Sequence, residues 1–317
     1  MADERVMNGL ANAVNEYLTI RRAVGFKLER VEERLRQFVE FAESEGATRV
    51  TCDLALRWAK QPDTASVAWW AARLCAVRGL ARYLQAFDPL TEVPPNDLLP
   101  RVCVADTRAV PYLYSSADVD ALMGQARAIR SPLTAATCET LIGLLSTTGM
   151  RVGEALRLDQ TDLDVDRGVL TVRDSKNARS REVPLHPTTT NALAVYAQIR
   201  DRAWPSPATP AMFLTRNGDR PSYITMNWHF QRLVCRAGLE PKSERSRPRM
   251  HDFRHAFACS TLEDWYRTGV DVQPRLPLLS TYLGHLQPVS TYWYLSGKPE
   301  LLALAAQRLH DKTEARR

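Results

Sequence analysis

A proline-rich stretch near residue 100 constrains the fold of this chain more than any other feature, because it interrupts the regular patterns of apolar residues. It runs from Asp88 to Pro111 and carries five prolines, at positions 89, 94, 95, 100 and 111. Such a composition is typical of a linker. The chain has 317 residues, which is enough for two domains. We therefore predict a first domain at residues 1–88, a linker at residues 89–113 and a second domain at residues 114–317.

The first domain is predicted to be all helical. Apolar residues recur at helical spacing in four segments, near residues 4–24, 28–44, 52–59 and 64–84. Gly25 and Gly46 follow the first two segments and are suited to end them. Four such helices are sufficient for a small bundle. The most apolar segment, Ser66 to Leu74, holds two tryptophans and is expected to be a buried helix.

The second domain is predicted to combine helices with a small sheet. Helices are expected at residues 116–129 and 132–147 and from about residue 152. The clear strand signal is a hairpin, in which Val169–Val172 and Arg181–Leu185 flank a polar tip. A further short strand is expected at Met212–Thr215. The predicted fold class of the whole chain is therefore mainly α with a small β-sheet.

Composition argues against several other classes of protein. No apolar stretch approaches the ~20 residues that cross a bilayer. The first ten residues, MADERVMNGL, lack the apolar core of a secretory signal, so we expect a cytoplasmic protein. The six cysteines show no CxxC or CxH spacing, so we expect buried free thiols and neither a zinc site nor a disulfide framework. They lie at positions 52, 75, 103, 138, 235 and 259.

The balance of charges favours an anionic partner. Lysine and arginine together number 42 against 36 acidic residues, which gives a net charge of +6 and a pI of about 9.1. This excess is suited to nucleic acid. Only six of the 42 basic residues are lysines, and the abundance of arginine fits either phosphate-binding forks or a coding bias of the source genome.

Residue types suited to holding a phosphate occur in four separated fragments. These are Thr148–Glu154, the hairpin tip with Lys176, His251–His255 and Leu283–His285, and a tyrosine-rich run at Ser290–Leu295 follows them. In a helix, His251 and Arg254 would share one face and could address the same oxyanion. Two arginines, a lysine and two histidines around a tyrosine could neutralise a phosphodiester while the phenol attacks it. Taken singly, each could equally be a solvated, capping or packing residue.

In their order along the chain, these fragments resemble the tyrosine recombinase (phage integrase) family, in the style of Xer-type and transposon-borne integrases. The matching motifs are TGMRVGEAL at 148–156, SKNARSREVPL at 175–185, HDFRHAFA at 251–258, LGH at 283–285 and STYWYL at 290–295. The helical first domain is similar to the family's core-binding (SAM-like) domain, which clamps DNA. The resemblance therefore covers nearly the whole chain and implies a site-specific DNA recombinase, which is an enzyme.

The resemblance implies a set of catalytic residues, namely Arg151, Lys176, His251, Arg254, His285 and the nucleophile Tyr294. Tyr294 follows His285 by nine residues, the spacing that the family favours, and is preferred for that reason to Tyr292 and Tyr282. Glu154 resembles an acidic residue that supports the site, although a solvated helix residue would look the same in the sequence.

By the same resemblance, Tyr294 would attack a DNA phosphodiester and form a 3′-phosphotyrosyl intermediate without metal, ATP or another cofactor. Arg151 and Arg254 would hold the non-bridging oxygens of the phosphate. His251 would accept the tyrosine proton, and Lys176 would protonate the leaving 5′-oxygen. The outcome would be integration, excision or transposition of a mobile element.

The implied partner is double-stranded DNA with specific recombination sites, bound at the nucleoid by four protomers or together with related recombinase subunits. A tail helix predicted at Pro299–Leu309 would dock on a neighbouring protomer, or else pack on its own domain. Two other functions on the same fold stay open. One is a type IB topoisomerase that relaxes DNA, and the other is a DNA-binding accessory protein without catalysis.

One region departs from the pattern of the family. Thirty residues separate Arg254 from His285, which is longer than in the compact Xer-type members. A glycine and two prolines lie within Tyr266–Leu278, at positions 269, 274 and 277. We therefore expect the added residues to form a loop in this segment.

Overall fold

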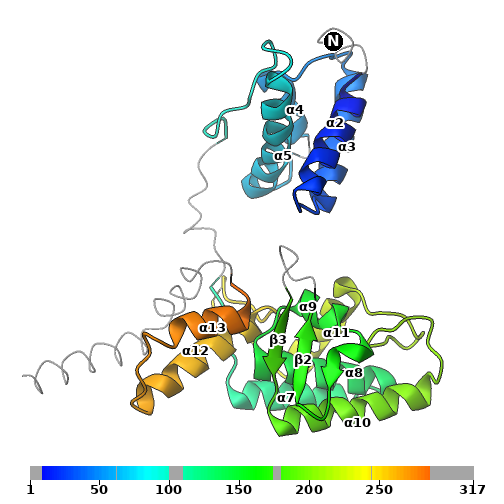
Figure 1. The fold of residues 1–317 in the computed structure, drawn as a ribbon, viewed down its shortest axis with the longest axis vertical. Helices are drawn as coiled ribbons and strands as arrows, with labels where there is room; N and C mark the ends of the chain where they lie inside the picture. Colours follow the sequence, from blue (N-terminus) through cyan, green and yellow to red (C-terminus); the bar gives the residue numbers. More distant parts are fainter. Residues whose placement is uncertain (1–8, 62, 100–109, 174–179, 244, 286–317) are drawn as a thin grey trace, which may run out of the picture. The chain divides into compact units, whose positions relative to one another are not determined.

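The computed structural model describes residues 9–61, 63–99, 110–173, 180–243 and 245–285. The chain divides into two compact units, residues 1–108 and 109–317 (Figure 1). Each unit has a hydrophobic core of its own. The predicted fold class is confirmed, because most described elements are helices and the strands among them form one small sheet.

Four helices build the described part of the N-terminal unit: α2 (Gly9–Ala23), α3 (Glu29–Ser44), α4 (Cys52–Ala59) and α5 (Val67–Gln85). The hydroxyls of Thr51 and Ser66 cap the first turns of α4 and α5 by accepting backbone N–H groups. Phe38 of α3 meets Trp58 of α4 edge to face, with ring centroids 5.2 Å apart. The predicted helices of this unit therefore form a bundle around an aromatic centre.

The apolar segment Ser66–Leu74 is less buried than predicted. Trp69 is 38% exposed, whereas the arginine at position 73 is only 6% exposed. The Arg73 guanidinium lies over the ring of Trp58 at 3.7 Å and that of Trp69 at 4.6 Å. Helical periodicity turns only one face of α5 toward the core, so a run of mostly apolar residues cannot be buried along its whole length there.

The predicted linker is not free at its described ends. Arg78 of α5 donates from Nε to the carbonyl of Pro94 at 2.6 Å and from Nη2 to that of Pro95 at 2.8 Å. Leu99 is buried in the N-terminal core, and Tyr112 is buried in the core of the C-terminal unit. Residues 89–99 therefore belong to the first unit and residues 110–113 to the second.

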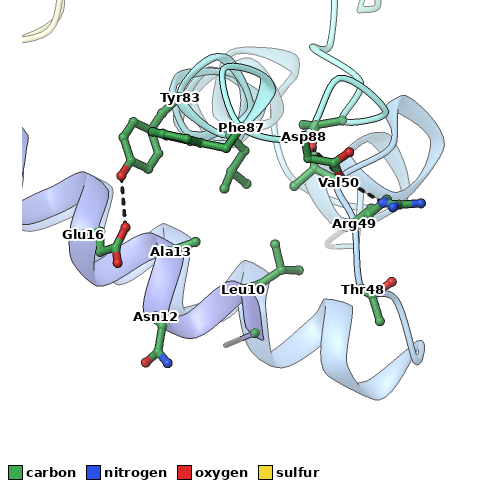
Figure 2. A pocket seen from close by; sticks show the side chains of 13 residues that line it. Leu10, Asn12, Ala13, Glu16, Thr48, Arg49, Val50, Tyr83, Phe87 and Asp88 are labelled. Carbon is green, nitrogen blue, oxygen red and sulfur yellow. Dashed lines mark hydrogen bonds and ion pairs between the residues drawn. The ribbon is translucent and has the colours of Figure 1, made fainter. Parts of the chain in front are cut away.

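A small hollow of about 70 Å³ lies where α2 meets the end of α5 (Figure 2). The Tyr83 hydroxyl donates to Glu16 at 3.2 Å on one side of it. Arg49 pairs with Asp88 at 2.9 Å on the other side. Each contact joins segments that are far apart in the sequence, so the hollow marks a seam in the bundle.

The described part of the C-terminal unit surrounds helix α8 (Figure 1). Its helices are α7 (Ser116–Arg127), α8 (Pro132–Thr148), α9 (Val152–Arg157), η1 (Gln160–Asp162), α10 (Pro187–Ala203), α11 (Tyr223–Arg236), α12 (Asp252–Arg267) and α13 (Leu276–Leu283). Helix α8 packs against α7, α10 and α12 and buries Leu141, Leu144 and Leu145. A helix that is apolar on most sides is suited to such a central place.

The sheet has the antiparallel order β1 (Leu163–Asp164), β2 (Val169–Val172) and β3 (Arg181–Pro184). The predicted hairpin is confirmed, with Leu170 opposite Val183 and Val172 opposite Arg181. Leu170, Val172 and Val183 are buried, whereas Glu182 and Pro184 are exposed. The alternation of side chains along a strand thus directs one face of the hairpin into the core.

The strand expected at Met212–Thr215 is absent from the structure of this described segment. The Met212 N–H donates to Leu158 O at 2.9 Å, and the Leu214 N–H donates to the Tyr196 hydroxyl at 3.0 Å. The carbonyls of Met212 and Leu214 accept from side chains of Arg200 and Thr137. The segment is buried as predicted, but side chains and loop backbone together satisfy its polar backbone groups instead of a neighbouring strand.

Two further expectations need correction. The loop expected within Tyr266–Leu278 is shorter, because α12 continues to Arg267 and α13 begins at Leu276. Pro277 lies in the first turn of α13, where a missing N–H costs nothing.

The thiols of Cys138 and Cys259 are buried, but those of Cys75 and Cys235 are exposed on helix surfaces, and Cys103 lies outside the described residues.

Candidate active site

The turn between α8 and α9 places Arg151. Helix α8 ends at Thr148 and is capped by Gly149, which has a left-handed backbone with φ of 60°. A Cβ at this position would approach the ring of Phe257 to 2.6 Å, so the close packing requires glycine. Two residues later, Arg151 has extended backbone angles and stands immediately before α9. The TGMR sequence therefore forms a tight turn with an arginine at its end.

Glu154 lies in the first turn of α9 and is only 3% exposed. Its carboxylate accepts from Nη1 of Arg151 at 2.7 Å and from the Arg151 backbone N–H at 3.1 Å. Arg181 of β3 donates to both carboxylate oxygens, at 2.8 and 3.3 Å. Glu154 is therefore a buried anion between two arginines, and the alternative of a solvated helix residue is wrong.

These contacts determine the charge of Glu154. Burial acts to raise the pKa of its carboxyl, but the hydrogen bonds and charges of Arg181 and Arg151 outweigh burial and hold the pKa at about 2. The carboxylate therefore stays ionised at neutral pH. A permanent anion here keeps both guanidinium groups in fixed positions.

The HDFR motif forms the start of α12. Arg254 is 2% exposed and donates from Nη1 to Gly149 O at 3.0 Å and from Nη2 to Leu283 O at 2.7 Å. It thereby connects the turn between α8 and α9 to the end of α13. His251 precedes the helix and keeps an exposed side. Partial burial of its ring and the charge of Arg254 lower the pKa of His251.

The LGH motif ends α13. Gly284 has a left-handed backbone with φ of 70°, and the His285 N–H donates back to Ser280 O at 2.9 Å. The carbonyl of Gly284 accepts from Nη2 of Arg151 at 2.9 Å. Burial, reinforced by the charges of Arg254, Arg151 and Arg181, lowers the pKa of His285 to about 4. The imidazole is therefore neutral at neutral pH.

Together, these residues form a corner that is rich in positive charge. The elements that meet there are the start of α9, the start of β3, the first turn of α12 and the end of α13. Two arginines and a neutral histidine in one place can bind an oxyanion and accept a proton. Among the residues that the structure describes, no group of three or more His, Cys, Asp or Glu could hold a metal ion.

Comparisons with known proteins agree with this arrangement. The sequence profile of the phage integrase family matches residues 114–300. The chain is 40% identical over 316 residues to a protein named as an integrase/recombinase, y4rB of Sinorhizobium fredii (strain NBRC 101917 / NGR234). The match covers 98% of this chain and 100% of that protein. This chain belongs to the phage integrase family of tyrosine recombinases.

Other similar proteins are tyrosine recombinase XerC of Pseudomonas aeruginosa PAO1 and two integrases of known structure. XerC is 28% identical over 254 residues, which cover 77% of this recombinase and 73% of XerC. The Tn1549 transposon integrase, solved with transposon right end DNA, matches with a TM-score of 0.64 at 16% sequence identity. The match covers 94% of this chain and 99% of the integrase chain. A λ integrase tetramer bound to a Holliday junction matches with a TM-score of 0.60 at 15% sequence identity, and the match covers 90% of this chain and 76% of the λ integrase chain. At these identities, the two structures show a shared fold.

The structure brings five of the predicted site residues of this recombinase into one region, namely Arg151, Glu154, His251, Arg254 and His285. Lys176 and Tyr294 lie outside the described residues, as do Tyr292 and the predicted tail helix Pro299–Leu309. The ring of Tyr282 stacks on that of Phe257 with centroids 5.7 Å apart, and burial raises the pKa of Tyr282 to about 12. That environment suits a packing residue.

Sequence reasoning missed one residue of this corner, Arg181. In the sequence, it appears as the first residue of a short strand, five residues after Lys176. In the structure, it holds both Glu154 and the end of α13. The available signal was its place inside the SKNARSREVPL motif, but nothing in strand periodicity distinguishes it from a solvated residue.

No helix within the described residues has the length and apolar character of a membrane span.

Proposed function

We propose that this recombinase cleaves and rejoins DNA strands at specific sites through a 3′-phosphotyrosyl intermediate on Tyr294, without metal or ATP. The observation that carries the proposal is the meeting of Arg151, Arg254 and His285 at the end of α13. A phosphodiester is an anion, and guanidinium groups match its oxygens in charge and geometry. The corner therefore supports the binding of a phosphodiester.

The arginines would bind the scissile phosphate. Each terminal nitrogen of a guanidinium carries two N–H groups, and the two bonds of Arg151 to Glu154 and Gly284 use one N–H on each nitrogen. Arg151 thus has N–H groups to offer to a phosphate oxygen. Its protein contacts fix its direction before substrate arrives, and preorganised donors stabilise charge that develops in a transition state.

The histidines would manage the proton of the nucleophile. The phenol of a tyrosine has an ordinary pKa near ~10, so it needs a proton acceptor at neutral pH. His251 and His285 both have lowered pKa values, and their neutral rings can accept a hydrogen bond or a proton. We assign the acceptor role to His251 and the positioning role to His285.

The reaction would exchange one phosphodiester for another. The oxygen of Tyr294 forms a bond to phosphorus while the bond from phosphorus to the 5′-oxygen breaks, and Lys176 supplies a proton to that leaving oxygen. Attack by a free 5′-hydroxyl then reverses the process and releases the tyrosine. Since the number of phosphodiester bonds is unchanged, no nucleotide hydrolysis is required.

The partners belong to the same proposal. We assign double-stranded DNA to both domains, with residues 1–88 as a core-binding domain and residues 114–317 as the catalytic domain. We also propose a tetramer on DNA, either of this chain alone or with related recombinases. The net charge of +6 and the fold shared with a DNA-bound transposon integrase and a λ integrase tetramer support these assignments. Integration, excision or transposition of a mobile element would be the outcome.

The direct test is covalent trapping. Wild type, Tyr294→Phe and Tyr292→Phe proteins are incubated with DNA from the native locus in EDTA without ATP, and adducts that resist SDS are counted. We expect adducts with the wild type and with Tyr292→Phe, and none with Tyr294→Phe. Adducts that persist in Tyr294→Phe would overturn the choice of nucleophile. An absence of adducts from the wild type on every DNA, with related recombinases added, would favour a non-catalytic DNA-binding protein.

A further inference from the structure

The geometry points to Arg181 as a positioning residue of the candidate site. It holds both Glu154 and the end of α13 in place, and it thereby sets the orientation of Arg151 and the position of His285. This inference rests on the proposed function, because it concerns the same site. Arg181 is the first residue of β3, and the reaction steps described above assign it no part. Its role follows from three sets of contacts.

The first set fixes Glu154. Nη2 of Arg181 donates to Oε2 of Glu154 at 2.8 Å, and Nη1 donates to Oε1 at 3.3 Å. Such a two-pronged contact fixes the plane of the carboxylate as well as its position. Arg151 binds the same carboxylate through Nη1 and its backbone N–H. The orientation of Arg151 therefore depends on how Arg181 holds Glu154.

The second set fixes the end of α13. The last carbonyls of a helix have no partner within the helix. Here three successive carbonyls, those of Tyr282, Leu283 and Gly284, each accept from a different arginine. Arg181 binds the first through Nε at 2.9 Å, and Arg254 and Arg151 bind the next two. Of these three arginines, Arg181 comes from the sheet and so anchors the corner to it.

The third set is steric. A Cβ on Gly284 would lie 2.8 Å from Nη1 of Arg181, which is closer than a Cβ atom approaches other atoms. Arg181 therefore packs directly against the glycine that precedes His285. Its side chain is 12% exposed, less than half the 28% of Arg151. Because Nε, Nη1 and Nη2 each donate to a protein group, we assign Arg181 an action through Glu154 and the end of α13 and not a contact with the phosphate.

Two variants of Arg181 and one control test this role. Arg181→Lys keeps the charge and loses the fork, and Arg181→Gln loses both. Arg167→Gln is the matched control, since Arg167 is an exposed arginine whose pairs with Asp164 and Glu182 lie on the same sheet. Amide hydrogen exchange of full-length protein without DNA is the first measurement. We expect exchange at Gly284 and His285 to accelerate in both Arg181 variants, while the amides of α8 keep the wild-type rate.

The second measurement separates catalysis from binding. With DNA from the native locus at saturating protein, we expect the single-turnover rate of adduct formation to fall by about 10²-fold in Arg181→Gln, because small displacements of positioned groups are costly. We expect Arg181→Lys to recover only part of this loss. The dissociation constant for the same DNA should stay within about 2-fold of wild type, since salt-dependent phosphate contacts elsewhere supply most of the affinity.

Several results would overturn the inference. One is wild-type exchange at Gly284 and His285 in both variants, and another is full recovery of the rate by Arg181→Lys. A third is exchange that accelerates equally in α8, which would mean a role in global stability alone. Because the exchange measurement needs no DNA, it stands even if the wild type forms no adduct and the proposed function fails.

Discussion

The two units of this recombinase bury arginine in different ways. In the N-terminal unit, Arg73 is held by the faces of Trp58 and Trp69 and donates one hydrogen bond, to Trp58 O at 3.0 Å. Within the described ranges, no carboxylate pairs with it. In the C-terminal unit, Arg254 donates to two backbone carbonyls, and Arg181 donates to a carboxylate and a carbonyl. Both settings exclude water, but only the second fixes the direction of each donor.

The difference separates packing from preorganisation. An aromatic face attracts a guanidinium without demanding one rotation of its plane, so Arg73 covers the core as a flat, adaptable group. Burial lowers its pKa, which is the sign of a charge poorly compensated by its surroundings. At the corner, carbonyls and Glu154 fix each guanidinium in a defined plane. That is the arrangement that a site for an oxyanion requires.

The largest effect is expected from Glu154→Ala. This change leaves the partly buried Arg151 and Arg181 without their buried anion, and breaking a buried pair in this way costs about 3–5 kcal/mol. Urea unfolding of the full-length protein measures the loss. Glu182→Ala is the control, because Glu182 is an exposed acid next to Arg181 on β3 and pairs with Arg167 at 3.5 Å. Equal effects of the two changes would show that Glu154 has no special place in the corner.

The next effect compares the two kinds of buried arginine directly. Arg254→Met leaves the carbonyls of Gly149 and Leu283 without donors, at about 1–3 kcal/mol for each. Arg73→Met also removes one hydrogen bond, but it replaces a poorly compensated cation by an apolar chain that can pack on the tryptophans. We expect its change in unfolding free energy to stay within about 1 kcal/mol. Urea midpoints of both variants decide the comparison, and a larger loss in Arg73→Met would contradict it.

A smaller effect is expected from the pH dependence of stability. The folded-state pKa of His285 is about 4, below its ordinary value of 6.5. Between these values the unfolded chain binds a proton that the folded chain does not, so stability falls as pH falls from about 6.5 to about 4. His285→Gln removes this contribution, and its unfolding midpoint should fall less steeply in that window. Parallel curves for the wild type and the variant would show that His285 is not buried among the arginines.

Much of the fold could be predicted from the sequence, because local patterns determine it. The hairpin at residues 169–185 follows from alternation along both strands. The prediction of a strand at Met212–Thr215 was wrong because an apolar run indicates burial but not the partners of its backbone. Here those partners include side chains such as Tyr196 as well as loop backbone. The burial of Arg73 was also not predicted. A charged residue in an apolar segment does not reveal from the sequence that an aromatic ring covers it.

The candidate site was only partly predictable. The residues of the five motifs came from a resemblance to a family, and the structure gathers Arg151, Arg254 and His285 as that resemblance implied. Arg181 lies inside one of these motifs, but its role could not be predicted, because that role depends on contacts across 27 residues to Glu154 and 101 residues to Tyr282. Residue spacing along one strand contains no information about such contacts.

The central claim is that the arginine corner serves a phosphodiester attacked by Tyr294, and mapping the attached residue tests it most directly. The covalent complex of wild-type protein with DNA from the native locus is digested with nuclease and protease. Mass spectrometry then identifies the peptide that carries the remaining nucleotide. The account predicts a 3′-phosphate linked to the oxygen of Tyr294. A linkage to Tyr292, to Tyr282 or through a 5′-phosphate would contradict it.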